Sequence, residues 1–180
     1  RKLFKQHGME NIAYWLPLDN EKNQLIYVLA YPSLEAREAS WKAFQADPKW
    51  VSAKAQSEVN GKLVNHVESF FMKATDFSPP ISALKKQHRI YEITTCEVKP
   101  GKMDELLAQF RDHTMSMWTR YGVSNVAYWT TIEKENTSPK LIYILAHKNK
   151  ASAAKTHYEL PLDPEWIKLQ SESERNGKLL

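Results

Sequence analysis

The sequence predicts an α+β fold made of two tandem ferredoxin-like repeats, each with the element order βαββαβ. Three observations support this prediction: long blocks of sequence recur, each copy alternates between strand and helix patterns, and the strands are apolar on both faces. We expect the two antiparallel sheets to stack face to face as a dimeric α/β barrel within one polypeptide.

Four blocks of sequence recur in the same order. Residues 8–15 return 114 positions later as residues 122–129, and the other blocks return at an offset of 116. These other pairs are 25–30 with 141–146, 47–50 with 163–166, and 57–63 with 173–179. The period exceeds the roughly 20 to 50 residues of a solenoid unit and matches a small domain. The sequence therefore indicates a tandem duplication, with repeats at 1–76 and 89–180 and a linker at 77–88.

The second repeat shows the first four elements most clearly. Residues 89–98 have the composition of a strand, and the turn at 100–102 begins a helix with apolar residues at helical spacing. Gly122 can end that helix as a left-handed cap. Residues 123–131 and 141–146 then form a predicted hairpin across a polar loop.

The first repeat shows the later elements. Its hairpin is predicted at 11–16 and 25–31, and Ser33 can cap the helix that follows. Asp47 and Pro48 restart the helix, because Asp is a good N-cap and Pro suits the first helical position.

A last strand is predicted at 64–72, which completes the βαββαβ order. Trp50 and Trp166 each follow a proline-started helical turn, so we expect both rings to be largely buried against a sheet. Compared with each other, the first repeat lacks its opening strand and most of its first helix, and the second lacks its last strand. We therefore expect the natural protein to extend at both ends, or neighbouring chains to supply these strands.

The predicted strands are apolar in both alternating registers, as in residues 12–16 and 25–30. Helices cover only one face of each sheet, so the other face needs a second sheet. The second sheet comes from the other repeat in an intrachain pseudo-dimer, or from another copy in a homo-oligomer.

Composition excludes several classes of protein. The 25 basic and 21 acidic residues are interspersed, for a net charge of +4, and 42% of the 180 residues are apolar. The basic run at 85–89 is predicted to be a solvated linker, so no nucleic-acid partner is expected. No apolar run approaches the about 20 residues of a transmembrane helix. The single Cys96 leaves no intrachain disulfide. The compartment stays open, because a signal or transit peptide ahead of Arg1 is not excluded.

Segments of both repeats carry a family resemblance: 7–15, 25–27, 36–44, 47–50, 67–72, 89–93, 100–102 and 110–114. They resemble the NIPSNAP family over nearly the whole chain, with a break at about 75–88. The resemblance implies a dimeric α/β barrel. Family members mostly have no established reaction, and animal members are associated with mitochondria and protein partners, which implies an interaction role.

The second repeat departs from the family pattern at three positions: Tyr121 replaces His7, His157 stands at the Trp41 position, and Ala153 replaces Arg37. We therefore do not expect the two halves to carry equivalent sites.

His113 is the first candidate for chemistry. It flanks the apolar face of a helix between Phe110 and Met117, so it could point between helix and sheet. There it could act as an acid or base near neutral pH, or ligate a metal or haem. The alternative is a histidine at the edge of the core with one backbone partner.

Aromatic pairs and a second histidine are further candidates. His7 closes a helix, where the helix dipole alone explains it, and no second ligand lies one turn away, so no metal site is predicted. Tyr14–Trp15 and Tyr128–Trp129 each direct one ring toward the helices and one toward the partner sheet. They either pack in the core or line a cleft for a flat apolar ligand.

Glu68 lies in the predicted strand at 64–72, where a carboxylate among apolar residues needs a polar partner. Arg37, on the helix that should cross the same sheet, is the expected partner. A structural ion pair, an exposed edge position and a catalytic acid are the three interpretations.

Two hypotheses of function follow. The chain has no phosphate-binding glycine-rich loop, Gly-x-Ser-x-Gly or His-Glu-x-x-His motif, so hydrolase and nucleotide-dependent functions have no support. The first hypothesis is a module that binds a small apolar ligand or a protein partner, without a cofactor. The second is a cofactor-poor monooxygenase or isomerase that uses His113 in a pocket between sheet and helices, by analogy with other dimeric α/β barrels.

Overall fold

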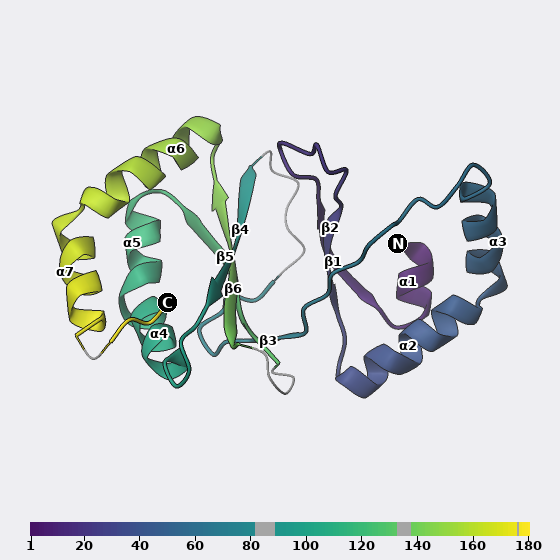
Figure 1. The fold of residues 1–180 in the computed structure, drawn as a ribbon, viewed down its shortest axis with the longest axis horizontal. Helices are drawn as coiled ribbons and strands as arrows, with labels where there is room; N and C mark the ends of the chain where they lie inside the picture. The colour runs from purple at the N-terminus through teal and green to yellow at the C-terminus, as the bar shows by residue number, and fades with distance from the viewer. Residues whose placement is uncertain (82–88, 133–137, 176) are drawn as a thin grey trace. The chain divides into compact units, whose positions relative to one another are not determined.

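The computed structural model describes residues 1–81, 89–132, 138–175 and 177–180. The fold is α+β, as predicted, and the chain divides into two compact units (Figure 1). Unit 1 contains Arg1–Glu68, and unit 2 contains Ser69–Ile81 and the described residues from 89 onward. No helix among the described residues is both long enough and apolar enough to cross a membrane.

Unit 1 is a two-stranded antiparallel hairpin with three helices. Its elements are α1 (Lys2–Gln6), β1 (Glu10–Trp15), β2 (Ile26–Ala30), α2 (Leu34–Ala46) and α3 (Pro48–Ser57). The hairpin predicted at 11–16 and 25–31 is therefore confirmed. Its two strands shift register between Asn11 and Ala13, where β1 carries one extra residue.

Side-chain caps mark the starts of α2 and α3 in unit 1. The Ser33 hydroxyl accepts the Ala36 amide at 3.1 Å, and Asp47 accepts the Lys49 amide at 2.8 Å to begin α3. The ring of His7 contacts the other oxygen of Asp47, with 2.8 Å between Nε2 and Oδ2. The end of α1 is thereby joined to the junction between α2 and α3.

Aromatic side chains form the core of unit 1. Phe44 is 3% exposed, and the ring centroids of Phe4, Trp41 and Trp50 lie 4.9, 5.6 and 4.6 Å from its own. Trp50 is neither fully enclosed nor exposed, so most of its surface is covered, as expected, but not all of it. The reason is that one side of this ring covers Phe44 while its other side borders a depression in the surface.

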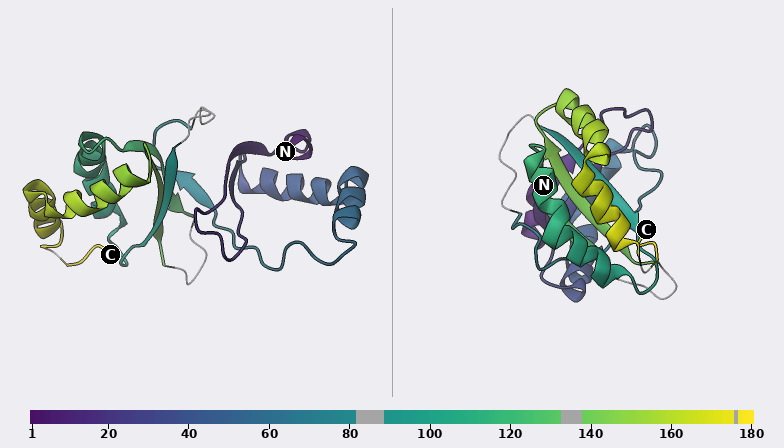
Figure 2. Two further views of the ribbon diagram at one scale, coloured as in Figure 1. Left: turned by 90° about the horizontal axis from the view of Figure 1, so that it is seen from above. Right: turned by 90° about the vertical axis from the view of Figure 1, so that its left-hand side faces the viewer.

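Unit 2 is a four-stranded antiparallel sheet with its helices on one face (Figure 2). The strands are β3 (Met72–Ala74), β4 (Ile90–Glu97), β5 (Ser124–Thr131) and β6 (Lys140–His147). The helical segments are α4 (Met103–Gln109), a π-helical turn (Phe110–Thr114), α5 (Met115–Arg120), α6 (Lys150–Glu159), a 3-10 turn (Leu160–Leu162) and α7 (Pro164–Ser173).

The strand order in this sheet is β3-β5-β6-β4. The hairpin of β5 and β6 confirms the prediction, and its register shifts between Asn125 and Ala127. The strand expected at 64–72 begins only at Met72, so that prediction was wrong in its bounds. Its pairing with β5 is continued by the Ile132 amide on the Phe71 carbonyl and the Thr75 amide on the Tyr128 carbonyl. The free edge of β5 therefore determines where this strand forms.

The core of unit 2 lies between the sheet and its helices. It contains twelve buried apolar side chains: Val98, Leu106, Phe110, Met117, Trp118, Val123, Tyr128, Leu141, Tyr143, Leu145, Leu160 and Leu179. Every residue from Leu141 to His147 is buried, in agreement with a strand that is apolar on both faces. Trp166 packs against the core but stays half-buried, because it borders a cavity.

The helix predicted after residue 100 is interrupted by the π-helical turn. The Met115 amide donates to the Phe110 carbonyl, five residues back, where a regular helix would bond four residues back. Beyond α5, Gly122 has a φ of +75°, which confirms its role as a left-handed cap. Single π-helical turns inside α-helices occur frequently at functional sites.

A hydrogen-bonded cluster around Asp163 gives unit 2 a predictable acid sensitivity. Asp163 Oδ2 accepts the Tyr121 hydroxyl at 2.8 Å and Arg120 Nη2 at 3.0 Å, while Oδ1 accepts the Glu165 amide at 2.8 Å. The bond from Tyr121, followed by that from the amide, lowers the pKa of Asp163. The ionised Asp163 therefore stabilises the folded state at pH values above its unfolded-state pKa of about 3.9. This stabilisation is lost as the pH falls through the lower pKa that Asp163 has in the folded state.

The variant Asp163→Asn is therefore expected to have a lower Tm at pH 7, and a smaller further loss of Tm between pH 5 and pH 2, than the natural sequence. Thermal unfolding followed by circular dichroism across this pH range measures both effects. The exposed Asp104→Asn, in the first turn of α4, is the control. An Asp163→Asn profile parallel to that of the natural sequence would contradict the assignment.

Candidate functional site

A cavity of about 280 Å³ lies between the sheet and the helices of unit 2. Glu92, Thr94 and Cys96 line it from β4, because alternate residues of a strand share one face. The helices contribute Leu106, Gln109, Phe110, Thr114, Trp118 and His157, and further lining residues come from the 3-10 turn, α7 and the C-terminal segment. The wall of the cavity is thus mainly apolar, with a few polar groups.

Two polar atoms in the cavity wall have no hydrogen-bond partner among the described residues: Thr114 Oγ1 and Trp118 Nε1. Thr114 is 1% exposed and Trp118 is 7% exposed, so solvent does not compensate them. A buried polar group without a partner costs about 1–3 kcal/mol. The two residues are four apart along the helix, so their side chains share one face.

Thr114 is the last residue of the π-helical turn, and its hydroxyl lacks the bond that other helical threonines of unit 2 make. Helical threonines commonly bond to the carbonyl four residues back, as Thr119 does to Met115 and Thr156 to Ser152, both at 3.0 Å. For Thr114 that carbonyl belongs to Phe110, which accepts the Met115 amide across the π-helical turn, and no bond from the Thr114 hydroxyl to any described residue is formed. The hydroxyl of Thr114 therefore remains available to a group inside the cavity.

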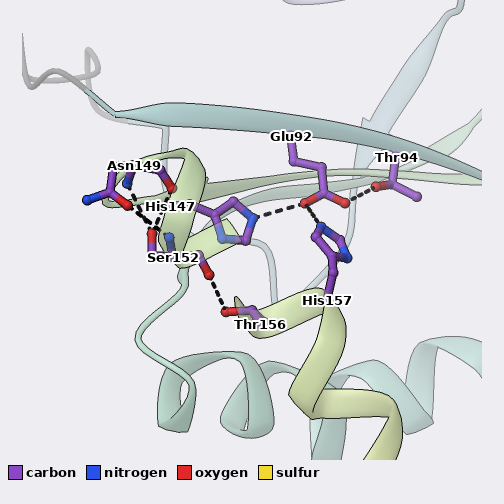
Figure 3. Close-up of polar contacts among 7 residues, drawn as sticks. All are labelled: Glu92, Thr94, His147, Asn149, Ser152, Thr156 and His157. Carbon is purple, nitrogen blue, oxygen red and sulfur yellow. Dashed lines mark hydrogen bonds and ion pairs between the residues drawn. The ribbon is translucent and has the colours of Figure 1, made fainter. Parts of the chain in front are cut away.

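A cluster of two histidines and a glutamate adjoins the cavity (Figure 3). Glu92 Oε2 lies 2.9 Å from Nε2 of His147 and 2.9 Å from Nε2 of His157. The other oxygen of Glu92 accepts the Thr94 hydroxyl at 3.4 Å. Glu92 and His157 line the cavity, while the side chain of His147 is only 1% exposed.

The fold positions this cluster through pairing and capping. Glu92 pairs with Leu145 across β4 and β6, so His147, two residues further, lies diagonally from it on the same face. Asn149 begins α6 through a capping box with Ser152, which fixes the turn that leads to His157.

Burial controls the acidity of the groups near the cavity. It raises the pKa of the Cys96 thiol, so this cysteine is not a thiolate near neutral pH. It also raises the pKa of Tyr143 to about 12, and burial likewise raises that of Tyr128. Neither tyrosine therefore serves as an acid or base near neutral pH.

The predicted candidates in unit 2 lie outside the cavity wall. Tyr128 is fully buried toward the helices, and its hydroxyl donates to Asn125. Trp129 is buried on the opposite face of the sheet, since adjacent strand residues alternate. His113 is exposed on the π-helical turn and does not point between helix and sheet. The structure does not bring these residues together.

The candidates in unit 1 are also dispersed. His7 is bonded to Asp47, and Tyr14 stacks on Tyr27 with 5.8 Å between ring centroids. Trp15 on β1 and Arg37 on α2 are half-buried.

Glu68 is exposed and precedes β3, so its expected place in an apolar strand was wrong. The physical reason is that this strand begins four residues later, where β5 offers its edge.

Sequence reasoning missed Glu92, His147, Thr114 and Trp118. One available signal was the repeat itself: at the offset of 116, His147 and His157 stand where the first repeat has Tyr31 and Trp41. Two aromatic residues replaced by two histidines indicate polar chemistry at one end of the second repeat only.

Comparison with curated proteins finds no match to the chain. The family description NIPSNAP matches residues 1–79 and 91–180, which is nearly the whole chain. This match confirms the resemblance noted in the sequence. The chain belongs to the NIPSNAP family.

Proposed function

We propose that this protein is a binding module for a small, mainly apolar ligand, and that the cavity of unit 2 is the binding site. The observation that carries the proposal is the pair of buried, unpartnered groups on Thr114 and Trp118. The indole N–H of Trp118 can only donate, so the ligand must present an acceptor to it.

The charge of the cavity wall favours a neutral acceptor. Its ionisable groups include the carboxylates of Glu92 and Glu174, and no lysine or arginine among the described residues lines it. A carboxylate ligand would meet repulsion without a cation to pair with, whereas a ketone or amide carbonyl would not. A volume of about 280 Å³ lies at the small end of ligand sites, which are typically about 300 to 1,000 Å³.

Acetophenone and benzoate provide matched probes, because both have a phenyl ring and differ in the charge of the acceptor. Isothermal titration with the full chain is expected to show saturable binding of acetophenone and at least about tenfold weaker binding of benzoate. Native mass spectrometry of the purified protein would show directly whether a ligand is retained.

The variant Thr114→Val is expected to act in opposite directions on stability and binding. It removes a buried hydroxyl without a partner, so the free protein gains about 1 kcal/mol in free energy of unfolding. It also removes a bond to the ligand, so acetophenone binds about tenfold more weakly. Thr119→Val is the control, because its hydroxyl bonds to Met115. Unchanged acetophenone affinity in Thr114→Val would overturn the assigned role of this hydroxyl.

We also propose that the chain is a tandem duplication, with repeats at 1–76 and 89–180 joined by a linker at 77–88. In support, both hairpins have a register shift at corresponding positions, Asn11/Ala13 and Asn125/Ala127. In both, a tyrosine donates to an asparagine three residues earlier and stacks on a cross-strand tyrosine, with centroids 5.8 and 5.6 Å apart. Family membership implies the dimeric α/β barrel, and we propose that the two sheets stack in that way.

A cofactor-poor enzyme of the isomerase type is the second candidate. The observation in its favour is that His157 and Glu92 line the same cavity and lie 2.9 Å apart, which suits proton transfer. Deuterium uptake by the methyl group of acetophenone in D₂O, followed by NMR, tests it. Exchange that depends on His157 would favour the enzyme, and exchange at the uncatalysed rate would favour the binding module.

A further inference from the structure

The cluster of Glu92, His147 and His157 has the donor set and spacing of a metal site. The three potential ligand atoms all lie within 4.8 Å of one another. Both Nε2 atoms lie 2.9 Å from Glu92 Oε2. We propose that these residues bind a divalent transition metal ion, with Zn²⁺ as the best match.

The donor types favour zinc over harder cations. Two imidazole nitrogens and one carboxylate oxygen are a common ligand set of Zn²⁺, whereas Mg²⁺ and Ca²⁺ require oxygen ligands. With bonds of about 2.0 to 2.1 Å, tetrahedral geometry places neighbouring ligand atoms about 3.3 Å apart. The two contacts of 2.9 Å must therefore open by only a few tenths of an ångström.

Three different elements hold the ligands in place. The register of β4 and β6 fixes Glu92 and His147, and the buried side chain of His147 has little freedom to move. His157 extends from α6 with a side chain that is 52% exposed, so it can adjust to the ion. This combination provides two fixed ligands and one that can close on the metal.

Metal binding through Nε2 moves the remaining proton of each imidazole to Nδ1. His157 is exposed enough for its Nδ1 to meet solvent. Nδ1 of His147 is buried and has no partner among the described residues. This Nδ1 atom is without a described partner in both tautomers of His147, so the change of tautomer adds no new hydrogen bond there. The free energy of metal binding therefore comes from the metal–ligand bonds.

Within the described part of the chain, this cluster occurs once. The positions equivalent to His147 and His157 in the first repeat are Tyr31 and Trp41, which are not zinc ligands of the usual kind. Three protein ligands leave a fourth position open, as in catalytic zinc sites. Because Glu92 and His157 also line the cavity, that position lies near where a ligand would bind. Zinc binding itself does not require the proposed ligand.

Isothermal titration of the EDTA-treated, dialysed full chain with ZnCl₂ tests the proposal. We expect one Zn²⁺ per chain, and a visible absorption spectrum of four-coordinate type when Co²⁺ is used instead. His157→Ala and Glu92→Gln should each weaken zinc binding by at least about tenfold. Both variants change side chains that are not fully buried, and circular dichroism checks that they remain folded.

Two control variants separate this site from surface binding. His113→Ala removes an exposed histidine of the same unit, and Glu97→Gln removes a carboxylate from the other end of β4. Both should bind zinc as the natural sequence does. The proposal is overturned if no zinc binds at one per chain, if His157→Ala and Glu92→Gln bind normally, or if the controls lose as much affinity.

Discussion

Replacing Tyr128 with alanine is expected to lower the free energy of unfolding of unit 2 by about 3–5 kcal/mol, as for other large aromatic residues in cores. Tyr128 is fully buried, and its ring is stacked on that of Tyr143 with 5.6 Å between centroids. Phe77 and Phe110 lie 5.5 and 5.9 Å away. Removing the ring leaves a cavity that these neighbours only partly fill.

One further variant separates the contribution of the Tyr128 ring from that of its hydroxyl, and another is a control at the surface. Tyr128→Phe removes only the hydroxyl that donates to Asn125, so we expect a loss of about 1 kcal/mol. Tyr158→Ala, at a side chain that is 74% exposed, should change stability by less than about 0.5 kcal/mol. Urea denaturation measures all three. A loss below about 1 kcal/mol for Tyr128→Ala would show that the ring is not part of the core.

Replacing Phe44 with alanine is expected to destabilise unit 1 by about 3–5 kcal/mol. Phe44 is the centre of the aromatic cluster, with the rings of Phe4, Trp41 and Trp50 around it at 4.6 to 5.6 Å. The described part of unit 1 has only two paired strands, so few other buried contacts compensate for this loss. We therefore expect α2 to unfold locally more often in Phe44→Ala than in any variant with a surface substitution in the same unit.

Hydrogen exchange followed by mass spectrometry measures this effect in unit 1 alone. Amides of α2 should lose protection in Phe44→Ala, whereas amides of β6 report on unit 2. Val51→Ala, at a side chain on α3 that is 54% exposed, is the matched control. Protection of α2 equal to that of the natural sequence would contradict the central role of Phe44.

Local patterns predicted much of the fold. The hairpins, the caps at Ser33 and Asp47 and the glycine at 122 were all found in the sequence, because each depends on residues close together in the chain. The bounds of β3 could not be found in this way. They depend on where β5 leaves an unpaired edge, more than 50 residues later.

The candidate site was less predictable than the fold. Glu92, His147 and His157 meet through the register of two strands and the direction of a helix, which no local pattern specifies. The unpartnered hydroxyl of Thr114 lies at the end of a π-helical turn, and the apolar spacing of the sequence does not reveal that turn. His113 was favoured because histidine suggests chemistry, but its side chain is exposed to solvent.

The edge strand β3 determines where a separately produced fragment of unit 2 should begin. It precedes the segment expected to link the repeats, yet its hydrogen bonds belong to the sheet of unit 2. A fragment that starts at residue 89 would expose the backbone of β5, and such edges recruit other strands. A fragment that starts at Ser69 keeps that edge covered, so it is the better starting point for producing unit 2 separately.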